Sequence, residues 1–202
     1  LDSLATHNYP GFGYGIRYEY GIFTQDIRNG QQVEHPENWL RYGNPWEVKR
    51  PNVLYPIHFG GRIACFKNAQ GTEECHWVDT QEVMAMAFDV PISGYNTNTV
   101  GNLRLWSSRA TRDFDLRFFN EGDYEDAVRE KTSSENISKV LYPNDKNQLG
   151  KELRLKQEYF FVSASLQDII ARHLRYHKSL DDLPDLTAMQ LNDTHPALAV
   201  PE

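Results

Sequence analysis

The stretch YPNDKNQLGKELRLKQEYFF, residues 142–161, determines how we interpret the rest of this chain. Its first half, residues 142–150, is rich in Pro, Asn, Asp and Gly, which favour turns. Its second half consists largely of good helix formers, and Glu152 precedes Lys156 by four residues, an orientation that supports a helix. The sequence therefore predicts a polar loop that leads into a long helix over about residues 151–177.

Three cations, Lys151, Arg154 and Lys156, lie close to the expected start of that helix. Cations at a helix N-terminus oppose the macrodipole, so local helix stability does not explain them. Two interpretations stay open. The cations form a solvated face with their stems along the surface, or they belong to a site for an anion or a sugar beside a gating loop.

Composition limits the class of partner. The chain has 202 residues, of which 40% are hydrophobic, and 21 basic against 28 acidic side chains give a net charge of −7. That balance argues against a nucleic acid bound by charge, whereas a neutral glucan needs no charge. No apolar run reaches the length of a membrane span and no signal peptide is recognisable, so we expect no membrane partner and a cytoplasmic location. The absence of an initial Met suggests a piece of a longer protein.

The two cysteines flank a turn-like segment, residues 67–71. A hairpin centred near Gln70 would place Cys65 opposite Cys75, close enough for a bridge. In a reducing compartment we expect free thiols instead.

The first half of the chain is rich in strand patterns. Residues 11–15 form a glycine cluster like a dinucleotide loop, but residues 16–23 are β-branched and aromatic and predict a strand, so we reject a nucleotide site. An antiparallel β excursion is expected at 55–59, 63–66, 76–78, 81–90 and 102–107. The fold class is therefore α/β with an antiparallel β excursion and long helices. About residues 1–110 form the strand-rich part and about residues 111–202 the rest.

Two further elements are expected in the second part. Residues 123–131 predict a helix capped by Asp123 and interrupted at 132–134, so poor in apolar side chains that it lies on the surface or protrudes towards a partner. Residues 187–191 predict a buried strand. The polar loop after it nominates Asp193 and His195, because ligands bind at the carboxyl ends of strands in α/β sheets.

Other chemistry is weakly indicated. His173 and His177 are four residues apart on the long helix, but no Cys or His near them offers a third ligand, so we predict no metal site. A nucleophile elbow and a P-loop are both missing from the sequence. The aromatic residues Trp39, Tyr42 and Trp46 either stack on sugars or anchor a loop by burial.

Seven stretches carry a resemblance to a known family, in order and over nearly the whole chain: IRYEYGIF (16–23), WLRYGNPWE (39–47), NLRLWSSR (102–109), FNEGDY (119–124), ENISKVLYPND (135–145), GKELRLKQEYF (150–160) and QLNDTHPALAVPE (190–202). Together they closely resemble the α-glucan phosphorylases. The resemblance implies a two-domain, Rossmann-like architecture of the glycosyltransferase B type, with pyridoxal phosphate in the second domain. It also implies phosphorolysis of α-1,4-glucan by inorganic phosphate, which releases glucose 1-phosphate.

The resemblance assigns roles to particular positions. Asn144 and Asp145 match the start of the gate loop of the active site, and Arg154 matches an arginine beside the catalytic channel. Asp193 and His195 match a motif that borders the glucan-binding cleft. Lys146 stands where many members have an Asn that contacts sugar, so that contact is not expected here.

The same resemblance bears on assembly and regulation. The helix that contains Tyr124 and Val128 resembles one that reaches a second subunit, so a homodimer is implied. Where animal enzymes regulated by AMP carry paired arginines, this chain has Ala171 and Arg172, so we expect weak activation by AMP or none.

The family's glycine-rich phosphate loop and its cofactor lysine have no counterpart here, so the chain alone should be inactive. The alternative function is a non-catalytic module that binds glucan or mediates dimerisation.

Overall fold

A four-stranded sheet forms the centre of the computed structural model, which describes residues 1–111, 120, 125–141 and 147–191. The strands lie in the order β1-β8-β7-β4. Strand β1 pairs in parallel with β8, whereas β7 is antiparallel to both β8 and β4. Their bounds are Phe12–Ile16 (β1), Val100–Ala110 (β8), Gln81–Ser93 (β7) and Val48–Phe59 (β4). This mixed sheet confirms the α/β class and the antiparallel excursion.

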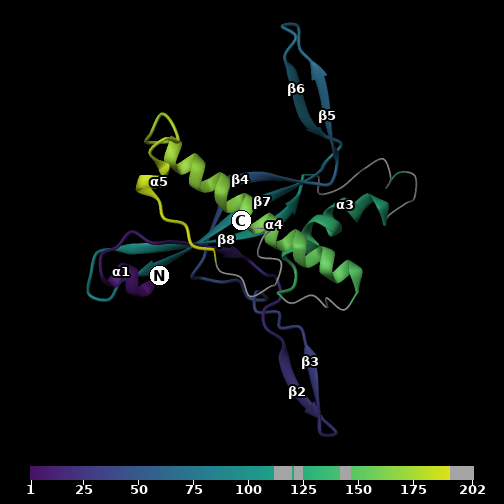
Figure 1. Cartoon of the computed structure of the whole chain (residues 1–202). Helices are drawn as coiled ribbons and strands as arrows, with labels where there is room; N and C mark the ends of the chain where they lie inside the picture. The colour runs from purple at the N-terminus through teal and green to yellow at the C-terminus, as the bar shows by residue number, and fades with distance from the viewer. Residues whose placement is uncertain (112–119, 121–124, 142–146, 192–202) are drawn as a thin grey trace.

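The helix α4 (Gln148–Leu174) crosses one face of this sheet (Figure 1). It begins three residues earlier than the sequence predicts, because the Asn147 side chain accepts a hydrogen bond from the Gly150 N–H at 2.8 Å and caps the helix. The predicted pair is present, with Lys156 Nζ 2.7 Å from Glu152 Oε1. The other helical segments are α1 (Asp2–Thr6), α3 (Asp126–Glu135), η1 (Asn136–Ser138) and α5 (Leu183–Leu186).

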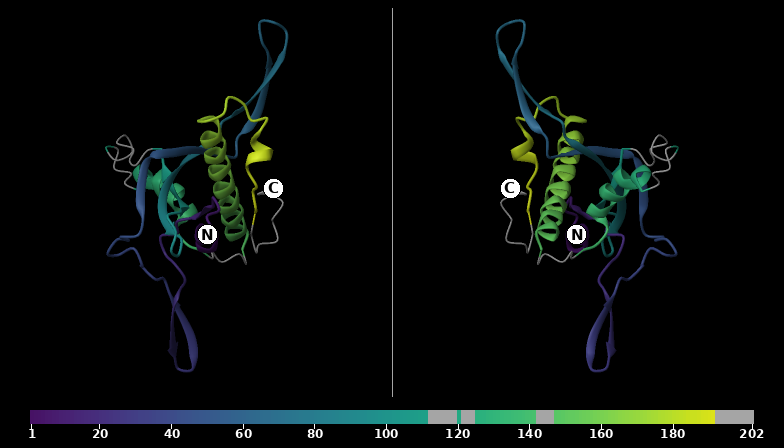
Figure 2. Two further views of the ribbon diagram at one scale, coloured as in Figure 1. Left: turned by 90° about the vertical axis from the view of Figure 1, so that its left-hand side faces the viewer. Right: turned by 90° about the vertical axis from the view of Figure 1, so that its right-hand side faces the viewer.

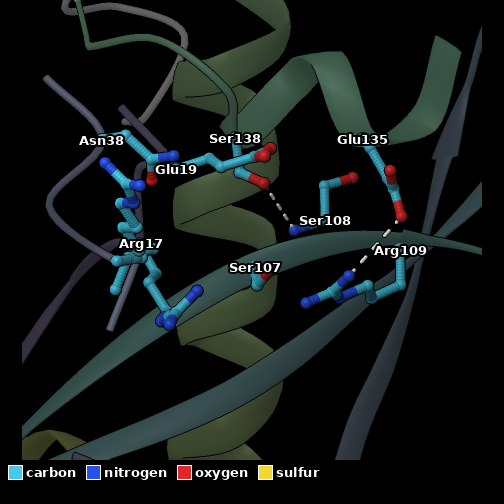
Figure 3. A pocket seen from close by; sticks show the side chains of 10 residues that line it. Arg17, Glu19, Asn38, Ser107, Ser108, Arg109, Glu135 and Ser138 are labelled. Atoms are coloured by element: carbon cyan, nitrogen blue, oxygen red, sulfur yellow. Dashed lines mark hydrogen bonds and ion pairs between the residues drawn. The ribbon is translucent and has the colours of Figure 1, made fainter. Parts of the chain in front are cut away.

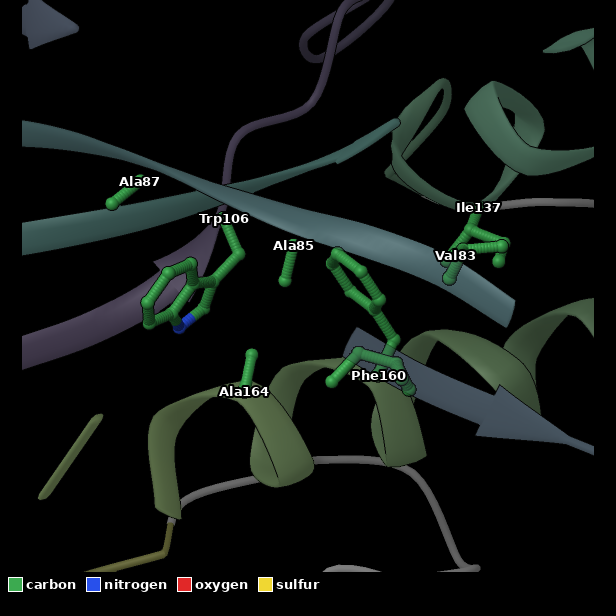
Figure 4. Close-up of a cluster of buried hydrophobic side chains, with 8 residues drawn as sticks. Val83, Ala85, Ala87, Trp106, Ile137, Phe160 and Ala164 are labelled. Atoms are coloured by element: carbon green, nitrogen blue, oxygen red, sulfur yellow. The ribbon is translucent and has the colours of Figure 1, made fainter. Parts of the chain in front are cut away.

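The hydrophobic core lies between α4 and the sheet (Figure 4). Alternate residues of β7 point towards the helix, since successive side chains of a strand face opposite sides. Phe160 and Ala164 of α4 meet them, four residues apart on one helix face. The buried cluster consists of Ile57, Val83, Ala85, Ala87, Trp106, Ile137, Phe160 and Ala164.

Two hairpins project from the sheet in opposite directions (Figures 1 and 2). One pairs β2 (Thr24–Arg28) with β3 (Gln31–His35), and the other pairs β5 (Arg62–Lys67) with β6 (Glu73–Val78). Every residue of β2 is exposed, as are most residues of β5 and β6. Neither hairpin therefore contributes to the core.

The expectation of free thiols is wrong in this structure, because Cys65 and Cys75 form a disulfide. They are direct partners in the β5–β6 ladder, with Cα atoms 4.0 Å apart, as the predicted hairpin requires. The bridge therefore cross-links a hairpin that has no core contacts to stabilise it.

The glycine cluster is part of a strand. Residues 12–16 form β1, whereas residues 17–23 are irregular except for a bridge between Tyr20 and Val140, so the predicted strand over residues 16–23 is wrong. A Cβ atom on Gly13 would lie 2.6 Å from a Leu1 side-chain carbon, and one on Gly15 would lie 2.9 Å from Leu105. The leucine side chains therefore pack directly against the backbone of these glycines in the strand.

Two predictions for the second half need correction. Residues 187–191 form no strand and are mostly exposed, because no strand within the described ranges pairs with them. The surface helix α3 begins at Asp126 and continues to Glu135, so residues 132–134 do not interrupt it. Thr132 is accommodated because its hydroxyl donates to the Val128 carbonyl at 3.1 Å. The predicted cap, Asp123, lies outside the described residues.

No helix in the described ranges has both the length and the apolar character that a bilayer crossing requires.

Candidate functional site

Most of the residues nominated from sequence lie beyond the part of the chain that the structure describes. This holds for the gate residues Asn144, Asp145 and Lys146, and for Asp193 and His195. Tyr124 of the expected dimer helix lies outside as well. Arg154, Arg172 and Val128 are described, and they lie on two different helices.

Arg154 lies in the second turn of α4 and is largely covered. Its side chain is 14% exposed, its Nη1 donates to the Leu141 carbonyl at 3.4 Å, and its Nε lies 3.7 Å from Glu158 Oε1. The arginine therefore joins the helix to the residue just before the predicted gate loop. Of the two interpretations of the cations, a freely solvated face does not fit Arg154.

Further along α4, the carboxylate of Asp168 is the centre of a buried polar network. Arg104 Nη1 donates to Asp168 Oδ1 at 2.6 Å, and the Tyr14 and Tyr55 hydroxyls donate to Oδ2 and Oδ1 at 2.6 and 3.1 Å. Arg104 also binds Asp89 through two hydrogen bonds, at 2.7 and 2.8 Å. The network links strands β1, β4, β7 and β8 to the helix.

The network shifts the pKa values of Asp89, Tyr14 and Tyr55. Burial alone would raise the pKa of Asp89, but hydrogen bonds from Arg104 and Asn102 outweigh it and lower the pKa. Burial, with the nearby Asp168 carboxylate, raises the pKa of Tyr55 to about 12 and that of Tyr14 further. Both tyrosines therefore remain hydrogen-bond donors at neutral pH. The stability that they contribute is lost only as pH rises above their ordinary value of 10.0.

Arg172 lies beside this network at the protein surface. Its guanidinium carbon is 3.9 Å from the centre of the Phe12 ring, and its Nη1 donates to the Tyr14 hydroxyl at 3.4 Å. Arg104 lies over the same ring at 5.3 Å. Asp89 and Asp168 already neutralise Arg104, so Arg172 is the more exposed of the two cations beside this ring.

A polar pocket of about 410 Å³ lies at the sheet edge, near the end of α3 (Figure 3). Two of its arginines are already paired, Arg17 with Glu47 at 2.6 Å and Arg109 with Glu135 at 3.5 Å. No pattern in the sequence predicts this pocket, because its lining comes from four separate stretches. It is lined by Arg17, Glu19, Asn38, Leu40, Arg41, Ser107, Ser108, Arg109, Glu135 and Ser138.

The aromatic segment over residues 39–46 is not anchored by burial. Tyr42 is 89% exposed and Trp46 is 77% exposed, and Trp39, at 39%, donates its Nε1–H to the Tyr18 carbonyl at 3.2 Å. Of the two interpretations, the loop anchor is wrong for Tyr42 and Trp46.

Comparisons with known proteins give a consistent assignment. The family model of carbohydrate phosphorylases matches residues 1–202. The chain is 54% identical over 202 residues to a glycogen phosphorylase of Chlamydia pneumoniae and 52% identical to one of Chlamydia trachomatis serovar D. It is 55% identical over 210 residues to the liver form of human glycogen phosphorylase.

Each of these alignments covers 100% of this chain but only 24–25% of the relative, so the chain spans about a quarter of the length of the curated relatives it matches. A family model that matches the whole chain, together with relatives that share more than half of its residues, shows common ancestry. The chain therefore belongs to the carbohydrate phosphorylase family.

Proposed function

We propose that this chain is part of an α-glucan phosphorylase that releases glucose 1-phosphate from α-1,4-glucan by phosphorolysis. The observation that carries the proposal is the family match over residues 1–202, with glycogen phosphorylases more than half identical across the whole chain. The architecture that we propose for the whole protein is the glycosyltransferase B type.

In this proposal the described residues position the catalytic channel. Arg154 holds the start of α4 against Leu141, which precedes the proposed gate residues Asn144, Asp145 and Lys146 in the sequence. The helix itself is fixed on the sheet by Phe160, Ala164 and the Asp168 network. In this proposal the rigidly held helix anchors the gate loop where the loop joins α4. Precise placement of groups supplies much of the catalysis in phosphoryl and glycosyl transfer.

The remaining assignments are part of the same proposal. Asp193 and His195 border the glucan cleft, and pyridoxal phosphate, held by a lysine elsewhere in the full-length protein, supplies a phosphate group for proton transfer. Homodimerisation would use the α3 region with Tyr124 and Val128, and Val128 is 40% exposed. We also propose a cytoplasmic location.

The test uses the full-length protein that contains this chain. Purified protein should absorb in the near ultraviolet as a pyridoxal phosphate enzyme does, and should form glucose 1-phosphate only when both maltodextrin and phosphate are present. A protein that binds maltodextrin but forms no glucose 1-phosphate would instead be the non-catalytic glucan-binding module.

AMP should stimulate this full-length enzyme less than about threefold, because a single arginine, Arg172, stands where paired arginines would bind the phosphate. A hydrogen bond to a charged group contributes roughly 1.5–3 kcal/mol, so a missing guanidinium weakens phosphate binding by about tenfold or more. Initial rates with and without AMP measure this. The Ala171→Arg variant should respond more strongly than the natural protein, and equal strong stimulation of both would contradict the prediction.

A further inference from the structure

A cluster of two histidines and one aspartate lies where α4 ends. His173 is in the last turn of the helix and His177 follows one turn later, with their rings stacked 4.3 Å apart at 12°. The chain then turns back and brings Asp182 to both of them. His173 Nε2 lies 2.9 Å from Asp182 Oδ1, and His177 Nδ1 lies 2.7 Å from Asp182 Oδ2.

The donor atoms of the three side chains lie close together. The two ring nitrogens and a carboxylate oxygen all lie within 4.8 Å of one another. The Ser179 carbonyl oxygen is 3.1 Å from His173 Nε2 and offers a fourth donor atom beside them. Two imidazoles with one carboxylate are a common protein ligand set for Zn²⁺ and similar divalent metals.

We propose that His173, His177 and Asp182 bind one divalent transition-metal ion, with Zn²⁺ as the best match. Tetrahedral zinc with ligands at about 2.0–2.1 Å separates its donor atoms by about 3.3 Å. Binding therefore requires the carboxylate to withdraw by about half an ångström from its present hydrogen bonds. It also requires the two stacked rings to turn relative to each other, because a metal lies close to the plane of each imidazole that binds it. Asp182 can withdraw because it lies in a turn between α4 and α5 and is itself half-exposed.

The proposal revises the sequence prediction of no metal site at this pair. In the sequence, no further Cys or His near His173 and His177 offers a third ligand. Asp182 reaches the pair through a turn rather than along the helix. The metal's role would be structural, since it joins the end of α4 to the segment that continues into residues 187–191.

The simpler alternative is a cluster held only by hydrogen bonds, without a metal. The metal site and the hydrogen-bonded cluster differ in a measurable way. In the hydrogen-bonded cluster the histidine nitrogens keep protons that they donate to Asp182, and added metal finds no preferred position. If a metal binds, both nitrogens must be unprotonated ligands, so binding releases protons and depends on all three residues.

The experiment uses full-length protein, stripped with a chelator and titrated with Zn²⁺ against a chromophoric competitor. The variants His177→Gln and Asp182→Asn each remove one ligand from a half-exposed position, which limits the risk of misfolding. His58→Gln is the matched control, because His58 also faces a carboxylate, Glu82 at 3.7 Å, but has no second histidine beside it. Co²⁺ serves as a spectroscopic probe of coordination.

We expect the natural protein and His58→Gln to bind one more Zn²⁺ ion than either ligand variant, or to bind it at least tenfold more tightly. Co²⁺ should give the intense visible absorption of a four-coordinate site in the first pair and lose it in the second. Equal Zn²⁺ binding and the same Co²⁺ spectrum in all four proteins would overturn the proposal. Because the readout is metal binding and not phosphorolysis, this outcome would leave the proposed function untouched.

Discussion

Replacing Arg104 with methionine should destabilise the sheet by about 3–5 kcal/mol, the usual cost of removing one partner from a buried ion pair. The arginine makes two hydrogen bonds to Asp89 and one to Asp168, and its side chain is only 9% exposed. Without it, two largely buried carboxylates lose the cation that joins them, and the only described cation that Asp89 keeps is the more exposed Arg50, whose Nε lies 3.9 Å from Oδ2. Amide hydrogen exchange of β7 and β8 in the full-length protein measures the loss as a lower free energy of local opening.

Arg62→Met is the matched control for this variant. Arg62 Nε binds Asp79 Oδ2 at 2.8 Å, nearly the distance of the Arg104–Asp89 bond, but the two side chains are 68% and 66% exposed. Exposed pairs contribute about 0–1 kcal/mol, so the control should change exchange little. Similar losses in both variants would show that burial is not what makes the Arg104 network important.

The pH dependence gives a second readout of the Arg104 variant. Since Arg104 and its neighbours lower the pKa of Asp89 in the folded protein, the stability from this carboxylate is present above the ordinary value of 3.8 and is lost as pH falls. In Arg104→Met, burial without the arginine should raise the pKa of Asp89. As pH falls below 3.8, the variant should therefore lose less stability than the natural protein does.

Local patterns predicted the parts of this fold that local forces determine. The α4 helix follows from the helix formers after residue 150, and its actual start needed only the capping ability of Asn147. The β5–β6 hairpin follows from alternating residues around a turn. In both cases the deciding contacts lie within a few residues of one another.

Distant contacts were not predictable in the same way. In the Asp168 network, Arg104 is 64 positions and Tyr14 is 154 positions away from Asp168 in the sequence. No pattern along the chain pairs either residue with Asp168. Residues 187–191 have the composition of a buried strand but find no partner strand in the described part of the chain. A strand depends on its neighbours more than a helix does, since its hydrogen bonds are made to other segments.

The functional assignment did not come from periodicity either. Composition favoured a neutral partner over nucleic acid, but the catalytic class rested on motifs such as GKELRLKQEYF over residues 150–160. The His173–His177–Asp182 cluster could be predicted only in part from the sequence. The spacing of the two histidines on a helix is evident in the sequence. The third donor, Asp182, is not, because it reaches them only through the turn that follows α4.

Trp106→Ala should cost about 3–5 kcal/mol in the same exchange measurement, the usual range for removing a large aromatic side chain from a core. Trp106 is 0% exposed, lies parallel to Tyr14 at 6.3 Å and meets the edge of Tyr55 at 5.7 Å. Alanine would leave a cavity between α4 and the sheet. It would also loosen the two tyrosines that donate to Asp168, so the loss should extend to the amides of α4.

Two further substitutions identify the cause of that loss. Trp106 Nε1 donates to Ser165 Oγ at 3.0 Å, but the serine hydroxyl itself donates to the Phe161 carbonyl at 2.7 Å, so the serine keeps a partner without the indole. Trp106→Phe should therefore recover more than half of the stability, because it restores most of the packed volume. Trp46→Ala, at a side chain that is 77% exposed, should change stability by less than about 0.5 kcal/mol. If Trp106→Phe proves as damaging as alanine, the indole hydrogen bond and not the packing is the main contribution of this residue.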